Sequence, residues 1–287
     1  MALNSAKRPP GLREALLFSK LRLARIYSGW WPVFILCLLV IGSAGWQSKD
    51  LLGSFWLYQL NFNVLVLPVT WTLTFELYFY GVIALGLLLP IRYRLASIGV
   101  VLLLLLACNS YWVIHERFTP ENFSRTHYGL FLFASPLCLE FLLGYLLQRY
   151  QTRLQHLLPT AVLALITLAS AAAVYIYAIY FAHRPSGLAG FFHYPERAIL
   201  AGLWACSLLA LFLRLGDWLP RKISLWGGDI SYQIYLLHLP CLWLITPWTT
   251  HLPLVWRLMA LLFSTLVAAS AMHYFIERPI YQFIKKF

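Results

Sequence analysis

Long apolar runs separated by short polar stretches dominate the chain. Each run is about 20 residues long, the length that a helix needs to cross the hydrocarbon core of a bilayer. The runs do not alternate between apolar and polar residues as the strands of a membrane β-barrel do. We therefore predict helices, which satisfy their own backbone hydrogen bonds in lipid. The predicted spans are 30–47, 71–90, 95–113, 129–148, 158–181, 197–215, 229–248 and 254–275.

The residues ahead of the first span follow a different pattern. Residues 1–29 are basic and interrupted by polar residues, so no cleavable signal peptide is indicated. Between Gly11 and Tyr27, Leu and Ile recur at helical spacing among Lys and Arg, which is typical of an amphipathic helix on a membrane surface. We therefore divide the chain into a basic cytoplasmic or interfacial segment, 1–29, and one transmembrane domain, 30–287.

Residues 48–70 form the longest stretch that we do not predict to span. Its apolar part, Leu57–Leu67, is too short to cross a bilayer as a helix. We expect this part to be re-entrant or to lie in the membrane interface.

Composition excludes a soluble domain. Hydrophobic residues make up 61% of the chain and charged residues only 11%, whereas a soluble domain carries about a quarter charged residues. The net charge of +12 could suggest a nucleic-acid partner. With the N-terminus in the cytoplasm, however, sixteen of the 22 Lys and Arg fall in cytoplasmic segments and six outside. This asymmetry supports an all-α bundle of about eight spans with both termini in the cytoplasm, and no nucleic acid.

Neither metal nor disulfide chemistry is indicated. The five Cys all lie inside apolar runs and none forms a CxxC pair. The histidines of the predicted outer segments are scattered without the spacing of metal ligands. We expect buried thiols and no metal site.

Ionisable residues within apolar spans are costly, so each one is informative. Thr72, Glu76 and Tyr80 are spaced i, i+4, i+8 and share one face of a helix. A carboxylate there either orients a catalytic base or an acceptor hydroxyl, or fixes packing through a hydrogen bond between helices. The sequence leaves both possibilities open. Glu140 also lies within a predicted span, and we expect it to have a packing role.

A second candidate is His238, which shares a helix face with Ser231 and Tyr235. A histidine with hydroxyl neighbours can be a general base or a substrate ligand. It can equally be a neutral side chain that a neighbouring helix satisfies, and both readings stay open.

Arg22 and Arg25 form a third candidate at the cytoplasmic end of the first span. At spacing i, i+3 they present adjacent guanidinium groups, which suit phosphates. Spacing alone favours the simpler role of anchoring the helix to anionic lipid.

Five segments, in order along the chain, resemble the acyltransferase-3 family of membrane acyltransferases. Lys20–Tyr27 resembles the family's basic RxxR element, and Gly228–His238 is similar to its G-D-x-S-Y-S-I-Y-L-L-H signature. Trp71–Tyr80 resembles its W-S-L-x-x-E-x-x-F-Y stretch, Glu140–Gly144 its E-F-L-L-G segment and Ile276–Pro279 its closing E-x-P. The resemblance covers nearly the whole chain.

The resemblance implies an O-acyltransferase that moves an acyl group, most often acetyl, from acyl-CoA to a hydroxyl of a cell-surface carbohydrate or glycolipid. Arg22 and Arg25 would bind the donor phosphates, which shifts their expected role away from lipid anchoring. Glu76 and His238 become the catalytic candidates, with Ser231, Tyr232 and Tyr235 in support. The implied setting is the plasma (inner) membrane, with acyl-CoA as donor substrate and no permanently bound cofactor.

The chain departs from the family at its beginning. Family members usually carry two further helices at that end. The first of these helices contains an Arg and, further along the same helix, the His to which catalysis is assigned. No such pair precedes Arg22. We expect a native start upstream of Met1 or a truncated, non-catalytic remnant, in preference to an accessory subunit of an intact acyltransferase.

Overall fold

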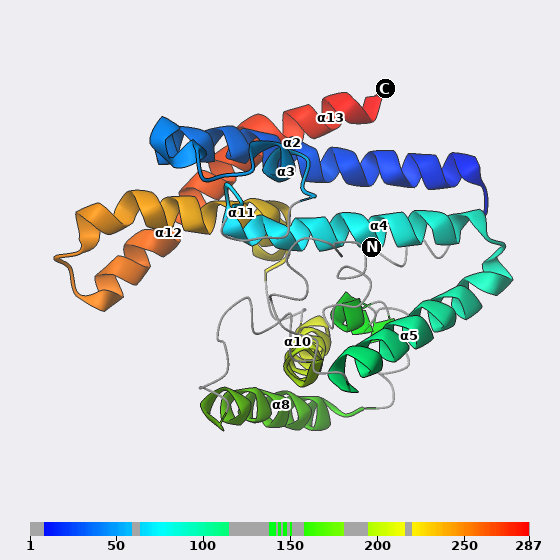
Figure 1. Ribbon diagram of the computed structural model, residues 1–287. Helices are drawn as coiled ribbons and strands as arrows, with labels where there is room; N and C mark the ends of the chain where they lie inside the picture. Colours follow the sequence, from blue (N-terminus) through cyan, green and yellow to red (C-terminus); the bar gives the residue numbers. More distant parts are fainter. Residues whose placement is uncertain are drawn as a thin grey trace. The chain divides into compact units, whose positions relative to one another are not determined.

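A computed structural model describes residues 9–58, 64–114, 138–141, 143–144, 146–147, 150, 158–180, 195–215 and 220–286. Among these residues the ordered elements are all helices and there is no strand, so the predicted all-α class is confirmed. Figure 1 labels the helices and colours them in order along the chain. The elements are α2 (Leu12–Trp46), α3 (Leu51–Phe55), η1 (Pro68–Thr70), α4 (Trp71–Leu88), α5 (Ile91–Ile114), α8 (Thr160–Tyr180), α10 (Pro195–Leu215), α11 (Arg221–Thr249), α12 (Leu254–Met272), η3 (His273–Glu277) and α13 (Arg278–Lys286).

Prolines mark where many of these helices begin. A proline has no N–H to donate and a fixed φ suited to the first turn, so it is tolerated at a helix start. The residues immediately before α5, α8, α11 and α12, and the first residue of α10, are prolines: Pro90, Pro159, Pro220, Pro253 and Pro195. Each of these five helices therefore begins at or directly after a proline.

The first predicted span is part of a longer helix. α2 begins at Leu12 and runs through the predicted boundary between residues 29 and 30. The basic stretch is therefore helical, as its pattern predicts, but continuous with the span. Gly42 interrupts the helical backbone near the far end with a φ of 67°, a left-handed conformation that glycine adopts without steric cost.

Five segments of the described chain are long and apolar enough to cross a bilayer. They are Leu12–Gly42, Pro68–Leu88, Thr160–Tyr180, Glu196–Leu215 and Leu254–Lys286. The predicted spans 95–113 and 229–248 fall on α5 and α11, which are not among the five. α11 carries the polar residues Asp229, Gln233 and His238 as well as two internal prolines, so it is less hydrophobic than the five spanning segments. The predicted span 129–148 lies largely outside the described residues. The number of eight spans and the cytoplasmic location of both termini stay predictions.

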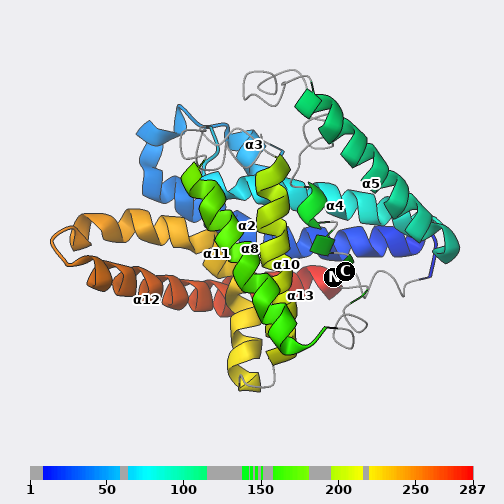
Figure 2. The same cartoon turned by 90° about the horizontal axis from the view of Figure 1, so that it is seen from below.

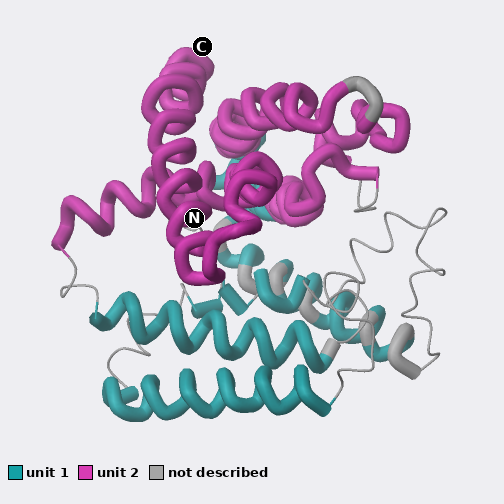
Figure 3. Tube along the Cα trace, turned by 90° about the vertical axis from the view of Figure 1, so that its left-hand side faces the viewer, with its two compact units in different colours: residues 1–15, 82–219 teal, residues 16–81, 220–287 magenta. Residues whose placement is uncertain are grey.

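Two compact units make up the chain, and Figure 3 colours them separately. Residues 1–15 and 82–219 form one unit and residues 16–81 and 220–287 the other. In the first unit α8 packs along α10, as Figure 2 shows. Tyr177 Oη donates a 3.0 Å hydrogen bond to Glu196 across this pair. Glu140 lies against Gly202, where an added Cβ would come within 3.2 Å of Glu140 Cγ, a contact in keeping with a packing role.

The second unit is built on α2, the first part of α4, and the hairpin of α11 and α12. α11 and α12 run antiparallel and join at residues 250–253 (Figures 1 and 2). α12 continues through η3 into α13. Every catalytic and binding candidate from the sequence belongs to this unit.

The segment between α2 and α4 packs onto α2 in this second unit. Trp30, fully buried, donates through Nε1 to the Ser54 carbonyl at 3.0 Å. Asp50 caps α3 by accepting from the Gly53 N–H at 2.8 Å. Leu57 and Leu65–Leu67 are buried as well. The described part of this stretch contains no spanning helix, in keeping with its short apolar length.

Candidate functional site

Two arginines lie on α2 in the second unit. The Arg22 guanidinium lies 5.3 Å from the centre of the Phe18 ring and 5.4 Å from that of Tyr80. These are cation–π distances, so the rings hold the guanidinium in place. Arg25, one turn further along, is exposed. Neither guanidinium forms an ion pair with a carboxylate of the described residues.

Glu76 and Tyr80 occupy successive turns of α4. Tyr80 Oη donates a hydrogen bond to Glu76 Oε1. The ring of Tyr80 also meets Phe18 edge-on at 6.0 Å. Tyr80 thus links the carboxylate on α4 to the guanidinium on α2, and the predicted shared face of Glu76 and Tyr80 is present.

Tyr232, on α11, lies near Glu76, Tyr80 and Arg25. Its hydroxyl donates to the Ile26 carbonyl on α2 at 2.9 Å. Glu76, Glu277, Tyr80 and Arg25 all lie close enough to interact electrostatically with that hydroxyl. We call Arg22, Arg25, Glu76, Tyr80 and Tyr232 the arginine–glutamate cluster, because these residues of three helices meet within one unit.

Close approach of α2 and α11 depends on Gly29. A Cβ at this position would clash with the Tyr232 ring and lie 2.6 Å from Gln233 Nε2. No side chain larger than hydrogen fits without moving α11. Gly29 therefore sets the spacing at which Tyr232 reaches the cluster.

Tyr235 has a fixed structural contact. Its hydroxyl donates to the Val69 carbonyl at 2.6 Å and lies 2.5 Å from Thr72 Oγ1. This triangle of oxygens joins the middle of α11 to the start of α4. Ser231, by contrast, is exposed and donates to the Gly228 carbonyl of its own helix at 2.9 Å. Tyr235 therefore holds two helices together, whereas Ser231 makes no hydrogen bond to His238 in the described structure.

His238 is half-buried on α11 and has a defined tautomer. Its Nδ1 lies 2.7 Å from the Tyr235 carbonyl oxygen. A carbonyl only accepts, so Nδ1 carries the proton in this hydrogen bond. In a neutral ring Nε2 then keeps its lone pair, which is the form a general base requires.

Three polar residues that are not among the candidates predicted from the sequence lie near Tyr232. Gln233 is fully buried and donates through Nε2 to Glu277 Oε2 at 3.0 Å. His273 Nδ1 contacts the same oxygen at 2.9 Å. The signal was available: Glu277 is an ionisable residue at the end of an apolar run, with a histidine four residues before it.

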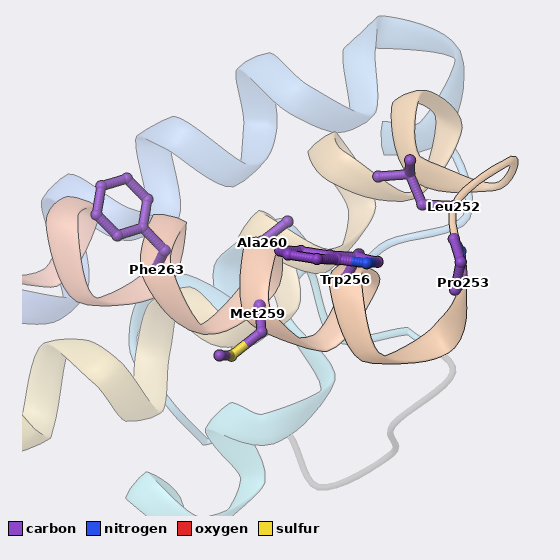
Figure 4. Close-up of a pocket in the computed structure, with 6 residues that line it drawn as sticks. All are labelled: Leu252, Pro253, Trp256, Met259, Ala260 and Phe263. Carbon is purple, nitrogen blue, oxygen red and sulfur yellow. The ribbon is translucent and has the colours of Figure 1, made fainter.

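An apolar cavity lies at the loop end of the α11–α12 hairpin (Figure 4). It is lined by Leu252, Pro253, Trp256, Met259, Ala260 and Phe263. These side chains offer no carboxylate, imidazole or hydroxyl that could orient a reacting group. The lining of this pocket therefore provides no candidate acid, base or nucleophile.

Within the described residues, no three His, Cys, Asp or Glu side chains gather as ligands of an ion. No disulfide joins the five cysteines, and Cys37, Cys138 and Cys241 are buried.

Comparison with known families decides the class of protein. A family model described as an acyltransferase domain matches residues 3–274. The chain belongs to the acyltransferase-3 family. With its long apolar helices it is a multi-pass membrane protein of an acyltransferase family. The matched range includes the whole arginine–glutamate cluster and His238, so these residues lie inside the acyltransferase domain. Neither the curated proteins nor the solved structures provide a match.

Proposed function

We propose that the chain transfers an acyl group, normally acetyl, from acyl-CoA to a hydroxyl of a cell-surface carbohydrate or glycoconjugate at the plasma (inner) membrane. The observation that carries this proposal is the arginine–glutamate cluster. Two guanidinium groups without a described carboxylate partner lie beside a hydrogen-bonded carboxylate and tyrosine within an acyltransferase domain.

Donor binding is the proposed role of Arg22 and Arg25. Coenzyme A carries several phosphate oxygens, and guanidinium groups bind phosphate through two parallel N–H donors. Arg22 is pre-oriented by the Phe18 and Tyr80 rings, so less side-chain freedom is lost when it binds. Arg25 is exposed and can meet a ligand that arrives from the aqueous side.

The reaction needs a hydroxyl oxygen to attack the thioester carbonyl. The new C–O bond replaces the C–S bond, and the hydroxyl proton ends on the sulfur of coenzyme A. A positioned base accelerates such a step by about 10² to 10⁴. Glu76 is proposed to orient the acceptor hydroxyl or the base. His238 is one candidate base, because its Nε2 keeps a lone pair.

A labelling experiment tests the proposal. Membranes with and without the chain are incubated with isotope-labelled acetyl-CoA, and label in carbohydrate esters is measured. We expect label that depends on the chain and is released by mild base, as an ester would be. No chain-dependent label in any carbohydrate or lipid fraction would contradict an acyl-CoA-dependent transfer.

A further inference from the structure

Glu277 is a buried carboxylate with two donors on one oxygen. It retains 6% of its surface. Gln233 Nε2 donates to Oε2 at 3.0 Å, and His273 Nδ1 lies 2.9 Å from the same atom. A buried carboxylate needs such donors, since unpaired charge in an apolar interior is strongly unfavourable. Glu277 is thus satisfied by one amide and one imidazole.

The orientation of Gln233 shows that this contact is specific. Its Oε1 is buried and has no hydrogen-bond partner in the described part of the chain. Turning the amide over would place Oε1 against the carboxylate and remove a donor from Glu277. An acceptor left unsatisfied in a fully buried side chain is unfavourable, so the Gln233–Glu277 hydrogen bond is made at the expense of that acceptor.

His273 and Glu277 occupy a π-helical turn. η3 interrupts the α-helical pattern between α12 and α13, and the Arg278 N–H donates to the His273 carbonyl five residues earlier. Such turns are rare and are found frequently at functional sites. Here the turn contains both members of the imidazole–carboxylate pair.

The pair has the geometry of a base oriented by a carboxylate. Because Glu277 accepts from Nδ1, the neutral His273 ring has its lone pair on Nε2. The His273 side chain keeps 13% of its surface exposed, so the ring is not sealed. A carboxylate on Nδ1 both fixes the tautomer and stabilises the imidazolium that forms when Nε2 takes a proton. His238 has only a backbone carbonyl in that position.

The pair also lies close to the arginine–glutamate cluster. The charge of Glu277 interacts with the same Tyr232 hydroxyl as those of Glu76 and Arg25. Gln233, which donates to Glu277, follows Tyr232 directly in α11 and contacts Gly29 of α2. One short stretch of α11 therefore connects the pair with the proposed donor site.

We propose that His273, oriented by Glu277 and Gln233, is the general base of this chain, in place of His238. This proposal rests on the proposed function. The step is a proton transfer coupled to attack of the acceptor hydroxyl oxygen on the acyl carbon. His273 Nε2 takes the proton of the acceptor hydroxyl as its oxygen bonds to the acyl carbon. The C–S bond then breaks, and the imidazolium returns the proton to the coenzyme A sulfur.

The test uses the full chain in native membranes, with acetyl-CoA as donor. His273→Asn can keep a donor to Glu277 but removes Nε2. We expect transfer at saturating acetyl-CoA to fall by about 100-fold or more, with coenzyme A binding changed less than about twofold. Glu277→Gln keeps a carbonyl oxygen for both donors and removes the charge, and should lower transfer by about tenfold. His251→Asn, in the exposed turn after α11, is the matched control and should behave as wild type.

Each outcome decides the proposal. Folded His273→Asn and Glu277→Gln variants that transfer at the wild-type rate would overturn it. Loss of folded protein in both variants, judged by gel filtration in detergent, would also overturn it in favour of a structural role. Failure of the proposed function is distinguishable, because wild type itself would then transfer no acetyl group.

Discussion

The Arg22 guanidinium lies 5.4 Å from the centre of the Tyr80 ring, one helix away. Tyr80 in turn donates its hydroxyl proton to Glu76. A cation, an aromatic ring and a carboxylate are thereby linked across α2 and α4 without a direct ion pair between Arg22 and Glu76 in the described structure. The rings hold the guanidinium in position, which suits the proposed phosphate-binding role.

Replacing Arg22 and Arg25 together by Lys should weaken donor binding. Lysine keeps the charge but loses the planar pair of donors and the stacking on Tyr80. We expect the KM for acetyl-CoA to rise by about tenfold or more, with a smaller change in kcat. Steady-state kinetics in membranes measure both.

Arg257→Lys on α12 provides the matched control for the arginine pair, since it makes the same exchange outside the cluster. Its kinetics should equal those of wild type. An unchanged KM in the double variant would leave Arg22 and Arg25 with lipid anchoring only.

The substitution Glu76→Gln distinguishes a catalytic role of the Glu76 carboxylate from a packing role. The amide is nearly isosteric and can still accept from Tyr80, so the helices should pack as before. We expect acyl transfer to fall by about 100-fold while coenzyme A still binds. Recovery of little folded protein from the membrane would assign Glu76 to packing.

Tyr80→Phe should have a milder effect than the Glu76 change. Phenylalanine keeps the ring under Arg22 but leaves Glu76 without its hydroxyl donor. Donor KM should therefore change less than about threefold, while kcat falls. A large rise in donor KM with unchanged kcat would mean that the hydroxyl serves donor binding.

Gly29→Ala should destabilise the second unit. The new methyl group would lie 2.6 Å from Gln233 Nε2 and against the Tyr232 ring. Overpacking of this kind costs about 1–3 kcal/mol. Thermal unfolding in detergent measures the loss.

Gly81→Ala on α4 is the control for the Gly29 change, because an added Cβ there meets nothing within 4 Å. Alanine favours a helix over glycine by about 1 kcal/mol, so this variant should be at least as stable as wild type. Equal melting temperatures for the two variants would show that α2 and α11 tolerate wider spacing.

Much of the fold could be predicted from apolar run lengths. The predicted spans 71–90, 158–181 and 197–215 correspond closely to α4, α8 and α10. The amphipathic helix over Gly11–Tyr27 was predicted, but its continuity with the following span was not, because charged residues on one face do not break a helix and so mark no boundary.

The site was predictable where spacing within one helix decides it. Glu76 and Tyr80 share a face because they are four residues apart, and their hydrogen bond follows directly. The contacts between helices were not predictable. The spacing along α11 does not predict that Tyr232 donates to the Ile26 carbonyl or that Gln233 donates to Glu277. The partners of these two hydrogen bonds are 206 and 44 residues apart in the sequence, so only the packing of the helices brings them together.

Transfer of label from acetyl-CoA into carbohydrate measures the proposed reaction itself. Membranes containing wild type, and membranes containing the Arg22→Lys, Arg25→Lys double variant, are compared at low donor concentration. We expect ester-linked label in cell-surface carbohydrate with wild type and at least about tenfold less with the variant. No label above that of membranes that lack the chain would contradict acyl transfer from acetyl-CoA, and equal labelling by both would contradict donor binding by Arg22 and Arg25.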